Sequence, residues 1–101
     1  MKPAVLAPLY IAIYPELAEL FRKNGYALAI HGSLAKDFDL VAVPWRREVS
    51  SVEEVLRELQ SEFGLKSVSS SVKDHGRLCH TVVAGCGTCY LDLSFVNIAN
   101  V

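Results

Sequence analysis

The sequence predicts an α+β protein with the element order α-β-β-α-β-β-β, in which two helices pack on one mixed or antiparallel sheet. Two segments repeat apolar residues at the three-to-four-residue spacing of a helix. The other apolar runs are short, alternate with polar residues or are rich in β-branched side chains, and are bounded by Gly, Pro or polar turns. These observations together favour helices that cover a sheet.

The first helix is predicted to begin at Pro15, because Pro suits the first helical position, and to end at Gly25. The apolar run 26–31 follows and is short enough to be a buried strand. A second strand at 38–43 is expected to pair with it across a short turn, and Pro44 closes that strand.

The second helix has the clearest signals in the chain. Ser51 and Glu54 form a capping box, and an apolar stripe at helical spacing continues from Val52 to Phe63, where Gly64 stops it. Three further strands are predicted at 66–73, 78–84 and 88–96.

The 101 residues are expected to form one domain, 1–101, with an N-terminal extension at 1–13 and a core at about 14–96. The composition is 51% hydrophobic, which predicts a protein partner or a homodimer that covers part of the surface. A net charge of -1 gives no attraction for polymeric nucleic acid, so we do not expect it as a substrate. The longest apolar run, 4–14, is too short to span a membrane, and a cytoplasmic location is expected.

Three aspartates form the most informative pattern. Asp37 and Asp39 follow a glycine-serine turn and are spaced one residue apart, so a strand would place both on the same face. Two carboxylates roughly 5 Å apart repel by about 3 kcal/mol at an effective dielectric constant near 20, unless a cation or a proton neutralises them. Asp92 lies on the polar face of a later strand. Mg²⁺ prefers such oxygen ligands, so the pattern predicts a cation site.

The combination of Gly32-Ser33, the Asp37/Asp39 pair and the later Asp92 resembles the polymerase-beta-like nucleotidyltransferase superfamily. The segment 31–45 is also similar to small proteins that phages and prophages commonly encode. The first resemblance implies a minimal domain that moves a nucleoside monophosphate from an NTP to a hydroxyl acceptor.

Under this interpretation, catalysis and metal binding fall to Asp37, Asp39 and Asp92, with Mg²⁺ as the cofactor and a two-ion site possible. A third carboxylate such as Asp92 would serve as a metal ligand or as a base. The candidate nucleotide-binding residues are Gly32, Ser33, Lys36 and Arg46.

The chain departs from the superfamily in one respect. Only three residues separate Ser33 from Asp37, where most members carry a longer segment whose helix holds the nucleotide phosphates. The alternative function is therefore a non-catalytic binding protein that keeps this fold, for example a phage accessory or inhibitor protein that acts on a host macromolecule.

The cysteines allow a second metal to be considered. Cys86 and Cys89 have the spacing of a zinc knuckle, and Cys79 precedes them. A structural zinc site usually brings two such pairs, so zinc at Cys79/Cys86/Cys89 is not expected. Three unevenly spaced thiols instead favour a reducing compartment.

Overall fold

The computed structural model describes residues 7–32, 37–72, 78–83 and 90–96. Within these ranges the element order confirms the predicted α-β-β-α-β-β-β. The elements are α1 (Ala7–Lys23), β1 (Tyr26–His31), β2 (Asp37–Pro44), α2 (Val52–Phe63), β3 (Lys66–Val72), β4 (Leu78–Val83) and β5 (Tyr90–Phe95).

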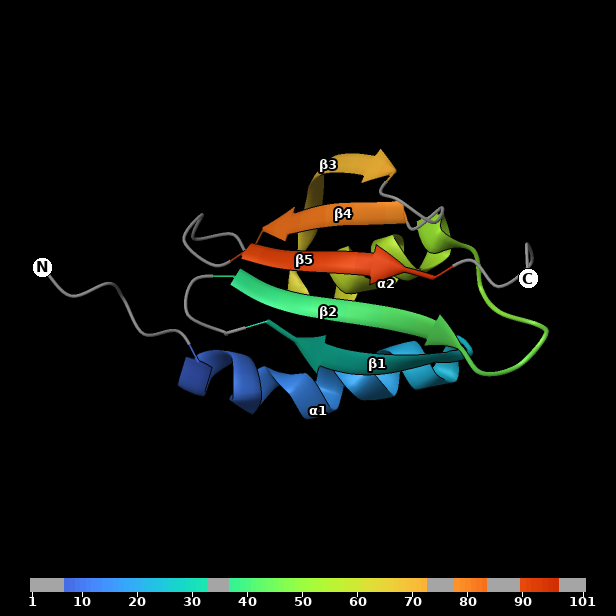
Figure 1. The fold of residues 1–101 in the computed structure, drawn as a ribbon, viewed down its shortest axis with the longest axis horizontal. Coiled ribbons are helices and arrows are strands. Elements are labelled where there is room, and N and C mark those ends of the chain that lie inside the picture. The colour runs from blue at the N-terminus through green and yellow to red at the C-terminus, as the bar shows by residue number, and fades with distance from the viewer. Residues whose placement is uncertain (1–6, 33–36, 73–77, 84–89, 97–101) are drawn as a thin grey trace, which may run out of the picture.

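The five strands form one mixed sheet in the order β1-β2-β5-β4-β3. The pair β2–β5 is parallel, and the other three neighbouring pairs are antiparallel. Both helices lie against the same face of this sheet (Figure 1). The core therefore fills one side, where alternate residues such as Phe38, Leu40, Leu91 and Leu93 are buried. None of the described helices lies on the other side, which we call the open face, and strand alternation places every second residue on it.

Helix α1 begins at Ala7, so the predicted start at Pro15 is wrong, and Pro15 lies inside the helix. An interior Pro removes one backbone hydrogen bond and costs about 3 kcal/mol. The burial of Tyr10 offsets this cost, because its ring is completely buried and stacks on Phe38 with 4.7 Å between ring centroids. Tyr10, assigned to the extension from sequence, thus belongs to the core, and Ile13 packs against it.

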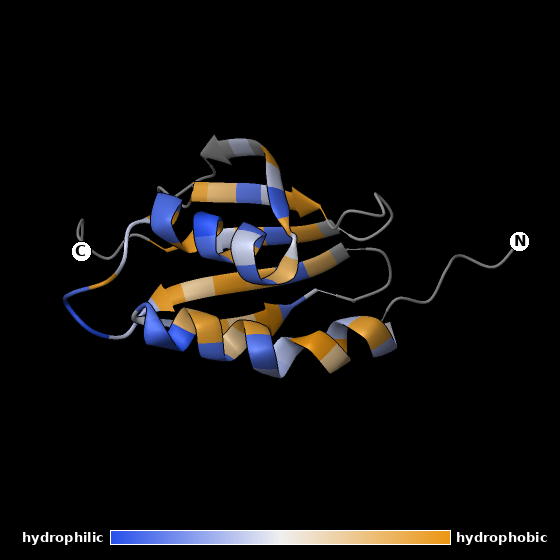
Figure 2. Cartoon of the chain, turned by 180° about the vertical axis from the view of Figure 1, so that it is seen from behind, coloured by the Kyte–Doolittle hydropathy of each residue, from blue (hydrophilic) through white to orange (hydrophobic). Residues whose placement is uncertain are grey.

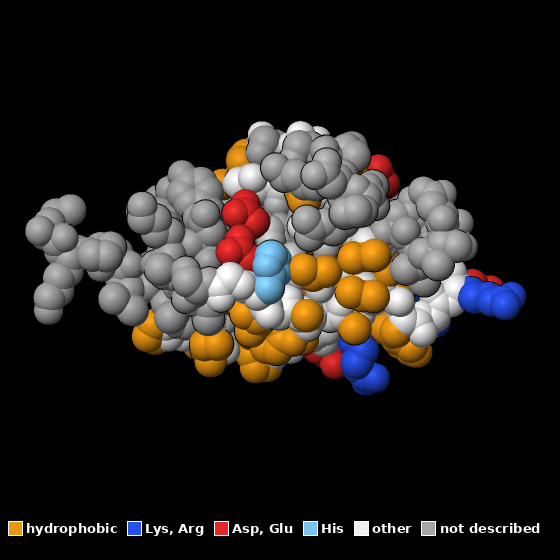
Figure 3. Space-filling model, viewed as in Figure 1, with side chains coloured by type: hydrophobic (Ala, Val, Ile, Leu, Met, Phe, Trp, Pro, Cys, Tyr) orange, Lys and Arg blue, Asp and Glu red, His pale blue; other side chains and the backbone are white. Residues whose placement is uncertain are grey.

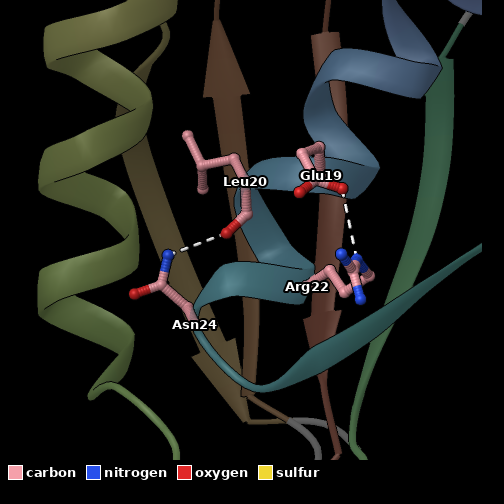
Figure 4. A network of polar contacts seen from close by, with 4 residues as sticks. All are labelled: Glu19, Leu20, Arg22 and Asn24. Atoms are coloured by element: carbon pink, nitrogen blue, oxygen red, sulfur yellow. Dashed lines mark hydrogen bonds and ion pairs between the residues drawn. The ribbon is translucent and has the colours of Figure 1, made fainter.

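The end of α1 is fixed by polar contacts (Figure 4). The buried Asn24 side chain donates to the Leu20 carbonyl at 2.8 Å, and Arg22 pairs with Glu19 at 3.2 Å on the exposed side. Gly25 then turns the chain with φ = 94°, in the left-handed region that favours glycine. This turn leads directly into β1.

The sequence prediction of α2 is confirmed. Ser51 and Glu54 form the capping box, and Gly64 ends the helix in the left-handed conformation with φ = 68°. Val55 and Leu59 are fully buried, so the apolar stripe faces the sheet and the charged face points to solvent (Figure 2). Neither helix of the described ranges is long and apolar enough to cross a membrane.

His80 on β4 lies on the helix-covered side of the sheet, edge-on to Phe95 with 6.0 Å between ring centroids. Its Nδ1 lies 3.3 Å from the Ser67 hydroxyl, and its buried Nε2 has no hydrogen-bond partner among the described residues. Burial lowers the pKa of His80 from its ordinary value, although the carboxylate of Glu53 acts in the opposite direction.

This lowered pKa gives a prediction about acid stability. Because the unfolded chain binds the proton more readily than the folded one, His80 contributes stability that is complete above about pH 6.5 and is lost as pH falls through the folded pKa. His80→Leu is expected to flatten the fall in unfolding free energy between pH 7.5 and pH 5. Urea unfolding of both proteins across this range checks it, and identical pH slopes would contradict it.

Candidate functional site

A row of polar residues crosses four adjacent strands on the open face of the sheet. His31 on β1 is in register with Asp39 on β2, and Asp39 is in register with Asp92 on β5. Asp92 is in turn in register with Thr81 on β4. We call these four residues the polar row. Figure 3 shows acidic side chains beside a histidine on this face, bordered by hydrophobic side chains.

The two acids of the row come from segments far apart in the sequence. The parallel pairing of β2 and β5 makes Asp39 and Asp92 direct neighbours, on strands about 5 Å apart. Their own neighbours along each strand, including Phe38, Leu40, Leu91 and Leu93, are buried on the opposite face. Alternation therefore fixes both aspartates on the open side, where each is half-buried.

Gly32 brings the backbone close to the Asp39 carboxylate. It has φ = 80°, and a Cβ atom at this position would lie 2.2 Å from Asp39 Oδ2. Any side chain here would therefore clash with the acid as well as strain the backbone. The predicted role of Gly32 in nucleotide binding stays a prediction, and the group that its backbone approaches in the structure is the Asp39 carboxylate.

Asp92 is held from its other side. The Thr81 hydroxyl donates to Asp92 Oδ1 at 3.3 Å across the β4–β5 pair. Next along the same strands, the Cys79 thiol lies 3.1 Å from the Ser94 hydroxyl. Asp92 thus has a neutral hydrogen-bond donor on one flank and a second carboxylate on the other.

These residues fit a divalent cation by the chemistry of their donors. Two adjacent carboxylates repel each other, and hard cations such as Mg²⁺ take carboxylate oxygens as ligands and keep several waters. Because Gly32 has no side chain, no Cβ atom at this position fills the space beside the Asp39 carboxylate. Among the described side chains no group of three His, Cys, Asp or Glu forms a cluster, so the fit rests on Asp39 and Asp92.

The remaining predicted acid and two of the nucleotide-binding candidates fall partly or wholly outside the described residues. The backbone of Asp37 belongs to β2 and is in register with Tyr90, but the Asp37 side chain is outside the described part. Ser33 and Lys36 are also outside it, as are Cys86 and Cys89 of the zinc pattern. Their predicted roles stay predictions.

The structure separates Arg46 from the acids. Asp39 lies near the start of β2, and Arg46 follows its far end at Pro44, roughly 16 Å further along at about 3.3 Å per residue. The Arg46 guanidinium donates to the carbonyls of Glu48 at 2.7 Å and Lys23 at 3.0 Å. The predicted role of Arg46 in nucleotide binding stays a prediction, and at this end of β2 the guanidinium lies away from the acid pair.

Trp45 also lies at this far end. The residue is 53% exposed, and the Arg46 guanidinium lies 5.2 Å from the centroid of its ring. Trp45 also borders a groove of about 400 Å³, which Tyr14 and Arg22 of α1 help to line. The groove lies at the edge strand β1, away from the polar row.

Sequence reasoning did not assign His31 or Thr81 to the site. His31 directly precedes the Gly32 turn, but its place opposite Asp39 depends on the strand register. Thr81 has no motif around it, and only the β4–β5 pairing brings it to Asp92. Only a prediction of the register between neighbouring strands would have identified His31 and Thr81.

No protein-family model matches the chain, and no curated protein matches it either. Solved structures with a similar fold do match the chain. The polymerase core of TRAMP, an RNA surveillance complex, is similar with a TM-score of 0.51 and 16% identity, over 86% of this chain and 32% of that one. A structure of the GLD-2/RNP-8 complex is similar with a TM-score of 0.51 and 14% identity, over 91% of this chain and 39% of that one.

These neighbours are nucleotidyltransferases, and at such identities the likeness concerns the fold. The chain has a minimal nucleotidyltransferase-like fold: two helices on one face of a five-stranded mixed sheet. It spans 32% and 39% of the lengths of these two solved chains. The predicted fold is confirmed.

Proposed function

We propose that this protein is a metal-dependent nucleotidyltransferase that moves a nucleoside monophosphate from an NTP to a hydroxyl acceptor. The observation that carries the proposal is the adjacency of Asp39 and Asp92 on the open face of a nucleotidyltransferase-like sheet. Two half-buried carboxylates from distant segments are costly side by side, and a cation that also binds phosphate would offset that cost.

In this proposal Asp39 and Asp92 would hold Mg²⁺, together with Asp37, which the period-two alternation of β2 predicts on the same face. Bound there, Mg²⁺ would neutralise charge on the triphosphate and help to orient it. The acceptor oxygen forms a bond to the α-phosphorus, and the bond to pyrophosphate breaks, so that pyrophosphate leaves. The acceptor proton passes to a carboxylate, for which Asp92 is the candidate, or to water.

The substrate proposals follow from charge and from the neighbours. Gly32, with Ser33 and Lys36, would face the phosphates of the donor. The acceptor proposed is a small molecule, a protein or an RNA end, and the net charge of -1 favours the first two because it gives no attraction for polymeric nucleic acid. Both solved neighbours are parts of complexes, which supports a protein partner here, and the 51% hydrophobic composition supports a homodimer as the alternative. We place the protein in the cytoplasm, where NTPs are abundant.

Isothermal titration calorimetry with each NTP, in Mg²⁺ and in EDTA, tests this function. We expect binding of at least one NTP by the wild-type protein in Mg²⁺, loss of that binding in EDTA, and loss in Asp92→Asn. Glu62→Gln, which removes an exposed charge on α2, is the matched control and should bind as the wild type does. Binding that is equal in Mg²⁺ and EDTA would contradict the metal-dependent function.

The alternative is a non-catalytic protein with the same fold, such as a phage accessory or inhibitor protein that acts on a host macromolecule. One fact favours it: the segment between Gly32 and Asp37 is short, so it leaves little room for a helix that holds the nucleotide phosphates. It predicts no binding of any NTP in the calorimetric titration.

A further inference from the structure

We propose that Thr81 is a positioning residue for Asp92, and that its hydroxyl sets the affinity of the site for a divalent cation. This inference rests on the proposed function, because it assumes that Asp92 is a metal ligand. It goes beyond that function by assigning a role to a residue on β4.

The hydrogen bond from Thr81 Oγ1 to Asp92 Oδ1 is the observation that carries the proposal. A carboxylate has two oxygens, and a donor on Oδ1 fixes the rotation of the group while it leaves Oδ2 available. Thr81 itself is stiff, because a β-branched side chain in a strand has few rotamers. The direction of its hydroxyl is therefore set by the backbone of β4.

The position of Thr81 makes this contact specific. Thr81 and Asp92 are register partners in an antiparallel pair, and both are half-buried. Asp92 has Asp39 as its partner on the other side. Without a donor on its β4 side, the Asp92 carboxylate would be free to turn away from the like charge of Asp39. The hydroxyl opposes this rotation and keeps the two acids poised together before a cation arrives.

Partners that hydrogen-bond to metal ligands typically change metal affinity by 10- to 100-fold when removed. Thr81→Val keeps the shape and the branching of the side chain and removes only the hydroxyl. We therefore expect Thr81→Val to weaken Mn²⁺ binding by about 10- to 100-fold. Thr81→Ser keeps the hydroxyl, so it should bind Mn²⁺ within a few-fold of the wild type.

The test is a Mn²⁺ titration of the full chain without nucleotide, followed by the EPR signal of free Mn²⁺, with thermal melting in EDTA to confirm folding. Cys79→Ala is the matched control, because it alters the neighbouring open-face residue of β4, which contacts Ser94 instead of Asp92. It should leave Mn²⁺ affinity unchanged. Thr81→Val is expected to melt close to the wild type in EDTA and to differ in metal affinity alone.

Equal Mn²⁺ affinity of wild type and Thr81→Val would overturn the role of Thr81 while leaving the proposed function in place. Equal weakening in Thr81→Val and Thr81→Ser would also overturn it, since the hydroxyl would not be the cause. A wild-type protein that binds no Mn²⁺ would instead refute the metal site on which the proposed function depends, and the role of Thr81 would fall with it.

Discussion

Asp39→Asn is expected to weaken Mg²⁺-dependent NTP binding by more than about 100-fold, because a lost ligand costs at least as much as a lost partner of a ligand. The same change should leave the folded protein equally stable or about 1 kcal/mol more stable, since it removes one of two adjacent like charges and keeps the side-chain volume. Binding and stability thus move in opposite directions.

Urea unfolding in EDTA gives the stability of this variant, and calorimetry with the NTP that binds the wild type gives its affinity. Glu62→Gln again controls for the loss of one negative charge. If Asp39→Asn unfolds the protein, Asp39 is a structural partner within the sheet and its role as a metal ligand is wrong.

Phe38→Ala should have the opposite effect, although Phe38 is the residue next to Asp39. Its side chain is fully buried, stacks on Tyr10, and has its ring centroid 6.5 Å from that of Tyr14. Truncation leaves a cavity between β2 and α1 and is expected to lower the unfolding free energy by about 3–5 kcal/mol. NTP affinity of the molecules that remain folded should change little, because the site lies on the other face.

Phe38→Leu is the graded control for this prediction and should cost less, because it refills part of the cavity. Denaturant midpoints at low temperature measure both variants. A Phe38→Ala protein as stable as the wild type would show that α1 does not depend on this contact, and that the place of Tyr10 in the core is wrong.

The elements themselves could be predicted because their signals are local. The capping box at Ser51, the stop at Gly64 and the alternation around Asp39 and Asp92 each depend on neighbouring residues only, and the structure has all of them. The predicted start of α1 was wrong because it relied on a local rule, that Pro often begins a helix. In the structure Tyr10, which precedes Pro15, is buried against Phe38 of the distant strand β2, so the helix begins earlier.

The site could be predicted only in part, because it depends on strand pairing. Alternation placed the aspartates on a polar face, but only the parallel pairing of β2 with β5 brings Asp39 opposite Asp92. Arg46 is close to Asp39 in the sequence, but the extended strand β2 runs between them, so Arg46 lies beyond the far end of the strand from the acids. His31 and Thr81 join the row through register alone, which no local pattern encodes.

Mn²⁺ titration of the ¹⁵N-labelled protein tests the central claim, a cation site on the polar row, most directly, because paramagnetic broadening falls steeply with distance from the ion. We expect small amounts of Mn²⁺ to broaden first the backbone amide signals of Asp39 and Asp92, then those of His31 and Thr81. The signals of Trp45 and Arg46 should stay sharp, and excess Mg²⁺ should reverse the effect. Broadening centred elsewhere, or none at all, would contradict a cation site on the polar row.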